Sequence, residues 1–515
     1  MPTKQIMELG RGGIIKDLPA VLLPDNAFSD GLNIRFDNES VETITGEIVS
    51  NTLNSFQADY GFHWNRPDQG YNIYLKDGNA IRVDSAKNQS SVIVLGSGVD
   101  YDDSVWQSTY FNGGYAVVIN NGRTTPKYML YGDLNYSNTF AEIPGWNYFG
   151  GLEVTARVIK PLGYSLVAAN LTINDNGTIV NAPSTIRISV QAVTGQFPST
   201  WEPGTTTDTA DELEINCSSP ILDMGELRGN MYIYSSDNIH VLSINTGISR
   251  VQPYAIGYGI LNTNCFAEFD GKHFVVDKND IYTHSGSGGI QSVADMRIRD
   301  YFFSNLNRDH SDKVFVKRNA RNDEIWVCYP KGSSSLCNEA LIYQYRNNTW
   351  SIRELPNVVS MFEAPINESN LFSYSDNRLH MLLGNYKVLQ ADTGYEMWSG
   401  SDLVPYDSYI AREKLNSGDT LGSVYISGIT PVFDNVPVDA SISITVTGQN
   451  NYVSNADWSN VSGRDTLEFL PNDDSSQGYK VNPRTTGRLL NYKISSASYW
   501  RLALIGIDVA PADRR

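Results

Sequence analysis

The chain repeats one local pattern, in which a short β-forming run, a tight polar turn and a second β-forming run follow each other. Turn pairs such as Asp77-Gly78 and Asn121-Gly122 readily adopt the positive φ angles of two-residue hairpin turns. Hairpins begin roughly every 40 to 66 residues, which indicates radial or stacked repetition. Blades of this kind bury both faces only by packing around a common axis, so the series predicts a β-propeller. The predicted hairpins cover Tyr71–Val83, Gly114–Tyr128, Gly163–Val190, Gly229–Leu242, Gly271–Tyr282, Glu324–Tyr343 and Asp376–Leu389.

The hairpin series occupies the middle of three zones, residues 56–400. Residues 1–55 form an N-terminal segment rich in turn residues. It contains a strand at Leu32–Phe36 that we expect to join a blade. The third hairpin is predicted to have a long Asn/Asp/Gly loop, and the interval from its start to the start of the next hairpin is the longest in the series. This long interval leaves room for an insertion near residues 165–225.

After residue 400 the pattern changes to that of a separate β domain. Ser441–Thr447 and Ile505–Val509 alternate apolar and polar residues, as strands with one buried face do. The turn-rich run Pro471–Gly478 separates them. We therefore expect a β-sandwich-like domain over residues 401–515, and the predicted fold class is all-β: a β-propeller core with an additional C-terminal β-sandwich-like domain.

Charge and hydropathy restrict the partners. The 57 acidic and 39 basic side chains give a net charge of −18, which opposes adhesion to nucleic acid because duplexes are held by Lys and Arg on phosphates. No run of about 18 apolar residues occurs, which predicts no membrane-spanning segment. The N-terminal Met1–Gly13 lacks the apolar segment of a secretory signal, so we expect folding in a cytoplasm.

Catalytic and metal-binding motifs are missing from the sequence. GxSxG, HExxH, a P-loop and a strand-linked GxGxxG do not occur, and the four cysteines lack metal or redox spacing. The best constellation is His273, Asp277, Asp280 and His284 around one hairpin turn, which we interpret as solvent-exposed edge residues rather than a metal site. We expect no enzyme activity, cofactor or metal.

Three groups of motifs occur in order along the whole chain. The first group is Gly13–Pro19 with Leu23–Phe36. The middle group consists of Glu268–His273, Asp280–Tyr282, Arg299–Phe303 and Asn322–Cys328, and the last consists of Thr486–Arg488, Trp500–Leu502 and the terminal Arg514-Arg515. In this order the groups resemble the tail nozzle proteins of short-tailed bacteriophages, the tail tubular protein B family, and the middle group is similar to the propeller blades of that family.

The resemblance implies a structural virion protein of the viral tail. Six copies would form a homohexamer, the distal tail tube or nozzle, which serves as a conduit and gate for DNA ejection. Its implied partners are a tail adaptor or portal-proximal protein, tail fibre or spike proteins, and passing double-stranded DNA in transient non-adhesive contact. The implied location is the virion tail, with assembly in the host cytoplasm.

An acidic lumen would let DNA slide without counterion-releasing contacts. The candidate channel-facing acidic loops comprise Asp100, Asp102, Asp103, Asp208, Asp211, Glu212 and Glu214. The alternative is that these clusters point outward, toward adaptor or fibre partners. An alternative for the whole protein is a glycan-acting or glycan-binding propeller, sialidase-like or kelch-like, with carboxylates in a pocket on its axis.

Overall fold

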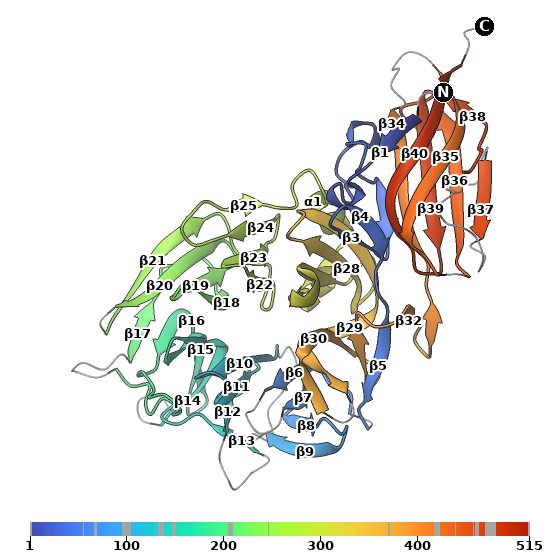
Figure 1. Ribbon diagram of the computed structural model, residues 1–515. Coiled ribbons are helices and arrows are strands. Elements are labelled where there is room, and N and C mark those ends of the chain that lie inside the picture. The colour runs from blue at the N-terminus through green and yellow to red at the C-terminus, as the bar shows by residue number, and fades with distance from the viewer. Residues whose placement is uncertain are drawn as a thin grey trace.

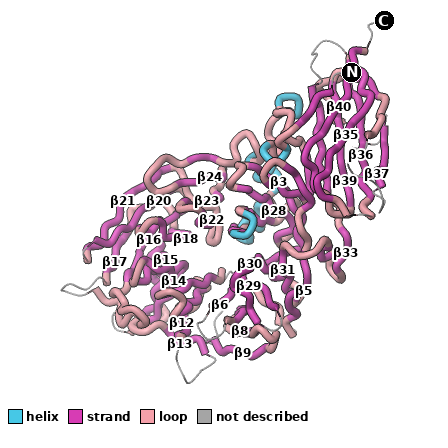
Figure 2. The backbone as a smooth tube through the Cα atoms, viewed as in Figure 1, coloured by secondary structure: helices cyan, strands magenta, loops and turns pink. Residues whose placement is uncertain are grey.

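In the computed structural model, antiparallel sheets stand around an axis, and a two-sheet sandwich lies beside this ring (Figure 1, Figure 2). The arrangement confirms the predicted fold class. The structure describes residues 3–54, 56–65, 70–94, 105–131, 139–146, 151–203, 210–245, 247–368, 371–416, 423–437, 439–456, 458, 463–468 and 480–512. Within them no helix is long and apolar enough to cross a membrane.

The first two blades are joined into one eight-stranded sheet. A parallel pair between their outer strands makes the junction, with Thr139 opposite Ile93. The first blade comprises β6 (Tyr60–Trp64), β7 (Tyr71–Lys76), β8 (Asn79–Val83) and β9 (Gln89–Val94), and the second comprises β10 (Gln107–Phe111), β11 (Ala116–Asn120), β12 (Lys127–Leu130) and β13 (Thr139–Glu142).

The next three blades are separate four-stranded sheets. The third comprises β14 (Glu153–Leu162), β15 (Ser165–Asp175), β16 (Thr178–Ile188) and β17 (Asp211–Glu214). The fourth comprises β18 (Ile221–Leu227), β19 (Asn230–Ser235), β20 (Asn238–Asn245) and β21 (Ile248–Ile256). The fifth comprises β22 (Phe266–Phe269), β23 (Lys272–Val276), β24 (Ile281–His284) and β25 (Gln291–Ser292). A short helix, α1 (Arg299–Asn305), leads to the sixth blade.

One seven-stranded sheet forms the last two blades. Its strands are, in sheet order, β26 (Phe315–Asn319), β27 (Glu324–Tyr329), β28 (Cys337–Gln344), β29 (Thr349–Glu368), β30 (Leu371–Leu383), β31 (Lys387–Ala391) and β5 (Glu47–Thr52). Near Asn357, which has a φ of 55°, β29 stops pairing with β28 and starts pairing with β30. This strand is therefore outermost in the sixth blade and innermost in the seventh. The described residues therefore contain seven blades: two in the eight-stranded sheet, three as separate sheets and two in this seven-stranded sheet.

The ring is closed by strands from both ends of the propeller sequence. β5 precedes the first blade in the chain, yet it pairs with β31 as the outer strand of the last blade. The last blade also packs on the first, where the Phe362 and Tyr74 rings lie 5.8 Å apart. Gly61 allows this approach, because a Cβ there would lie 2.8 Å from the Phe362 ring. The ring is therefore closed by pairing between a strand that precedes the first blade in the sequence and a strand of the last blade.

All seven predicted hairpins occur as antiparallel pairs. The loop of the third was predicted wrongly: β15 and β16 meet at a two-residue turn, Asn176-Gly177, with φ angles of 50° and 97°. The extra length near residues 165–225 goes into these long strands and into the β16–β17 connection. That connection buries Trp201 against Trp146, with ring centroids 4.7 Å apart.

The sandwich uses strands from both ends of the chain (Figure 1). One sheet contains β1 (Thr3–Ile6), β3 (Ile34–Asp37), β4 (Ser40–Thr43), β35 (Val424–Asn435), β38 (Thr485–Gly487) and β40 (Arg501–Pro511). The other contains β2 (Asp30–Leu32), β34 (Ser408–Asn416), β36 (Ser441–Gln449), β37 (Gly463–Glu468) and β39 (Leu489–Ser496). A two-stranded sheet, β32 (Glu396–Trp398) and β33 (Leu403–Pro405), lies between the propeller and sandwich strands in the sequence. The predicted run 471–478 is outside the described residues.

The N-terminal zone departs from the prediction. We expected the strand at Leu32–Phe36 to join a blade, which is wrong: β2 pairs with β34, and β3 pairs with β4, which pairs with β40. The segment still touches the propeller, since the Asn33 amide donates to the carbonyl of Ile352 at 2.8 Å. It is buried on both faces because it lies between the two units, and period-two alternation cannot show which unit supplies the pairing partner.

Candidate functional site

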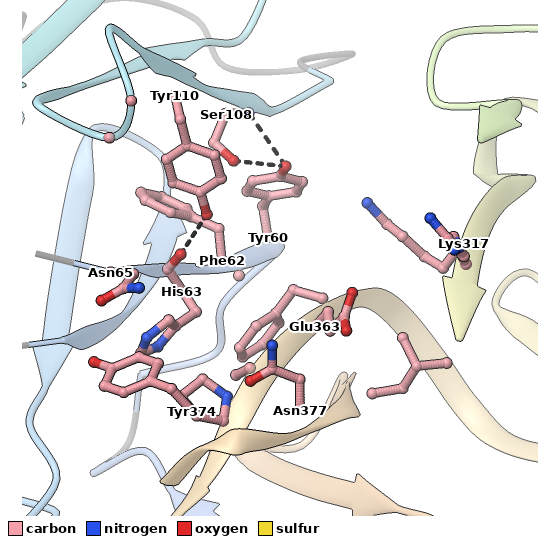
Figure 3. Close-up of a pocket in the computed structure, with 18 residues that line it drawn as sticks. Tyr60, Phe62, His63, Asn65, Ser108, Tyr110, Lys317, Glu363, Tyr374 and Asn377 are labelled. Carbon is pink, nitrogen blue, oxygen red and sulfur yellow. Dashed lines mark hydrogen bonds between the residues drawn. The ribbon is translucent and has the colours of Figure 1, made fainter. Parts of the chain in front are cut away.

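A candidate site among the described residues is a cavity of about 690 Å³ at the inner ends of four blades (Figure 3). Its walls come from β6 and β10 on one side and from β26, β29 and β30 on the other. The labelled side chains in Figure 3 are Tyr60, Phe62, His63, Asn65, Ser108, Tyr110, Lys317, Glu363, Tyr374 and Asn377. The volume falls within the range of small-molecule sites, roughly 300 to 1,000 Å³.

The aromatic wall is fixed by hydrogen bonds between the first two blades. The Tyr60 hydroxyl lies 3.1 Å from Ser108 Oγ and accepts from the Ser108 amide at 3.2 Å, and the Tyr110 hydroxyl donates to the carbonyl of His63. Phe62 is buried next to them. These bonds run between blades, so the ring faces keep their orientation as long as the two blades stay packed.

His63 is a neutral wall residue. It is 7 % exposed, and burial lowers its pKa to about 4. Nδ1 lies 2.7 Å from Asn72 Oδ1, and this amide oxygen can only accept, so Nδ1 carries the proton. The ring also meets Phe372 edge-on at 5.0 Å and Tyr374 at 5.9 Å. His63 therefore holds the tip of the β29–β30 hairpin against the first blade.

Charged groups face the aromatic wall. Lys317 and Arg318 come from β26, and Glu363 comes from β29. Burial lowers the pKa of Lys317, and the charge of Asp223 opposes this shift, although no direct hydrogen bond or ion pair joins Lys317 to another described residue. Desolvation raises the pKa of Glu363, and the charge of Arg318 partly offsets this shift. The Glu363 side chain is nevertheless exposed and lines the cavity. Two cations and one carboxylate thus line the cavity, and Asp223 and Asp323 lie close enough to act on Lys317 and Arg318 respectively.

Polar side chains of non-adjacent blades meet near the axis, beside this cavity. Gln107 Nε2, from the second blade, donates to Asp223 Oδ1 of the fourth blade at 3.2 Å and to Asn264 Oδ1 at 3.3 Å. The Asn264 amide, just before the fifth blade, donates to Asp223 Oδ2 at 2.8 Å. These bonds link the second, fourth and fifth blades directly, although the second blade is a ring neighbour of neither of the others.

The predicted acidic site residues are only partly visible. Asp100, Asp102, Asp103 and Asp208 lie outside the described residues. Asp211, Glu212 and Glu214 belong to β17, the outer strand of the third blade, and not to a loop. They lie on the rim of the subunit, away from its own axis, and Glu212 is 4.0 Å from the buried Arg187.

The histidine constellation differs from its interpretation as solvent-exposed edge residues. His273 and His284 lie directly opposite each other on β23 and β24 and are 0 % and 2 % exposed. The Tyr234 hydroxyl bridges them, 2.7 Å from His273 Nδ1 and 2.6 Å from His284 Nε2. Among the described residues, no group of three or more His, Cys, Asp or Glu side chains could hold a metal ion. The misassignment arose because a hairpin edge becomes a blade interface only once a neighbour packs on it.

Sequence reasoning did not select the cavity residues. Two local signals were present: adjacent Lys317-Arg318 inside a strand-like run, and Gly61 interrupting the aromatic run Tyr60–Trp64. Neither signal shows that these residues come together in space, because β6 and β26 are separated by about half of the chain and become neighbours only when the ring closes.

No family model matches the sequence, and the search of curated proteins gave no match. Among solved structures, YCF48 bound to D1 peptide aligns with a TM-score of 0.36 and 12 % identity, over 70 % of this chain and 96 % of that chain. The β-propeller domain of Myceliophteria thermophila Cps50 (Swd1) aligns with a TM-score of 0.42 and 9 % identity, over 67 % of this chain and 99 % of that chain. Similarity at this level concerns the propeller architecture alone, which the strand pairing above already defines.

Proposed function

We propose that the chain is a non-enzymatic structural subunit of a phage tail nozzle, six copies of which form a ring for genome passage. The observation that carries the proposal is the order of the three motif groups along the chain.

The first and last motif groups meet in space. The Thr43 amide, at the end of the strand pair that begins in the first group, donates to the carbonyl of Trp500 at 3.0 Å. Trp500 is fully buried, and its Nε1 donates to Ser408 Oγ at 2.9 Å. Gly487, in the last group, allows the backbone of Gln449 to approach, since a Cβ would lie 2.6 Å from its nitrogen. These motif residues maintain the sandwich, which agrees with an architectural role.

Buried ion pairs tie the sandwich strand β3 to the propeller. Arg35 Nη2 lies 2.7 Å from Asp392 Oδ1 and 3.2 Å from Glu324 Oε2, and all three side chains are buried. Arg353 Nη2 lies 2.9 Å from Glu47 Oε2, which connects β29 to the closing strand β5. Such contacts favour a stiff subunit, which a ring under internal pressure requires.

In this proposal the conduit lies between subunits. Polar side chains of several blades meet in the subunit's own centre, as the bonds from Gln107 to Asp223 and Asn264 show, so DNA would pass through the lumen of the ring instead. Six copies at −18 each carry a net charge of −108, which disfavours adhesive contact with phosphate. The rim carboxylates on β17 remain candidates for that lumen, with an outward orientation toward adaptor or fibre proteins as the alternative.

Native mass spectrometry and electron microscopy of the full chain, alone and mixed with tail adaptor protein, test the proposal. We expect a six-fold ring with an open lumen, formed by two different faces that each bury more than about 1,000 Å² in total. A persistent monomer with glycan turnover would support the glycan-acting alternative. A single two-fold dimer contact would contradict the ring.

A further inference from the structure

We propose that the cavity between β6, β10, β26 and β29 binds a sugar acid, a monosaccharide or disaccharide unit that carries a carboxylate. This binding site belongs to the single subunit and does not depend on the proposed ring. It is inferred from the size of the cavity, its two opposed walls and the charges between them.

The carboxylate would lie at Lys317. Lys317 lines the cavity and makes no direct hydrogen bond or ion pair with the described residues, and Asp223 is the carboxylate whose charge acts on it. Its side chain is only partly exposed, and a partly desolvated charge gains from a direct partner, so this group is suited to anchor an anion that enters with the ligand. Arg318 on the same strand strengthens the positive potential, and its Nη2 is kept in place by the Tyr345 hydroxyl at 3.3 Å.

Hydroxyl groups would meet the remaining polar side chains. Glu363 is exposed to the cavity and can only accept when ionised, so it fits O–H donors and repels a second carboxylate. Asn65, Asn377 and Ser108 supply both donors and acceptors around the same space. A ligand with a single anionic pole and several hydroxyls satisfies this set, whereas inorganic phosphate would leave Glu363 opposed by like charge.

The aromatic wall would contact the C–H face of the sugar ring. Tyr60 from the first blade is the partly exposed ring of this wall, and Phe62 and Phe362 also line the cavity but are only 2 % and 5 % exposed. Figure 3 shows Tyr60 and Phe62 on the wall opposite Lys317, so a ring lying on the aromatic side can direct its carboxylate toward the ammonium group. An aromatic acid could use these rings and Lys317 but would leave the hydroxyl-binding groups unused.

The test is isothermal titration of the full chain with D-galacturonate and N-acetylneuraminate as probes, compared with galactose, methyl galacturonate and benzoate. We expect at least one sugar acid to bind, and its neutral counterparts to bind about tenfold or more weakly, as loss of a charged hydrogen bond implies. Lys317→Met should weaken binding by a similar factor, and Lys278→Met, on an exposed turn, should not change it.

The ligand comparison keeps the test decisive if Lys317→Met fails to fold. Absence of binding to both sugar acids overturns the proposal. Equal affinity for galactose and galacturonate, or preference for benzoate, also overturns it. Because these measurements use the dissolved chain, a failure here leaves the ring proposal intact, and failure to form a ring leaves this site intact.

Discussion

Arg35 is the cation on which the junction between sandwich and propeller depends most. Replacing it with methionine keeps much of the side-chain volume but leaves Glu324 and Asp392 buried without their guanidinium. Removing one partner of a buried ion pair costs about 3 to 5 kcal/mol. The remaining donors reduce this loss, because Asp392 still accepts from Asn319 and Asn322 at 2.8 and 2.9 Å. We therefore expect a loss of about 4 kcal/mol at neutral pH, within the same range.

The loss should depend on pH in a defined direction. Burial alone would raise the pKa of Asp392, but the charge and hydrogen bonds of Arg35 hold it at about 2. This group therefore stabilises the native protein above the unfolded pKa of about 3.9, and its contribution disappears as the pH falls toward 2. Arg35→Met removes that contribution, so the difference between variant and native protein should shrink as the pH is lowered from 7 to 3.

Thermal unfolding followed by tryptophan fluorescence provides the assay. Unfolding entropy of roughly 2.1 cal/mol/K per residue over the 515 residues converts 4 kcal/mol into a decrease of about 4 °C if the chain unfolds as one unit. Arg346→Met is the matched control, because Arg346 is exposed and solvent screens its pairs with Asp323 and Asp270, so its loss should change stability little. Equal shifts for both variants, or a shift independent of pH, would refute the reasoning.

Three further outcomes follow from the packing. Trp326→Ala should destabilise the protein by about 3 to 5 kcal/mol and lower the yield of folded chain, because Trp326 is 0 % exposed; an unchanged melting temperature would contradict this. Burial lowers the pKa of His273 to about 4 and that of the neighbouring His284 to about 3. Below about pH 6.5 the unfolded chain therefore binds more protons than the native protein does. The melting temperature should consequently fall as the pH is lowered from about 6.5 toward 4. The double variant His273→Gln/His284→Gln should flatten that dependence, and an identical slope counts against the account. Gly12→Ala should prevent correct folding, since its Cβ would lie 1.9 Å from the Asn26 carbonyl oxygen, whereas Gly289→Ala, with open space around it, should behave as the native chain in circular dichroism.

The order of β-hairpins could be predicted because its causes are local. Asp77-Gly78 adopts positive φ at both residues, so the turn type and the pairing of the flanking strands follow from neighbouring residues. The alternating run at Ser441–Thr447 likewise became a strand with one buried face. The repeat of such units favoured a propeller, because isolated hairpins cannot bury both faces.

Non-local pairing was decided only by the tertiary structure. β3 has the same alternation whether it joins a blade or the sandwich, and its partner β4 pairs with β40, more than 450 residues further along the chain. His273 and His284 had the sequence pattern of a solvent-facing hairpin until Tyr234 of the preceding blade packed between them. The cavity at Lys317 arises in the same way, since ring closure alone brings β6 and β26 together. Local propensity thus determined which strands form, and the closure of the ring and of the sandwich determined which side chains meet.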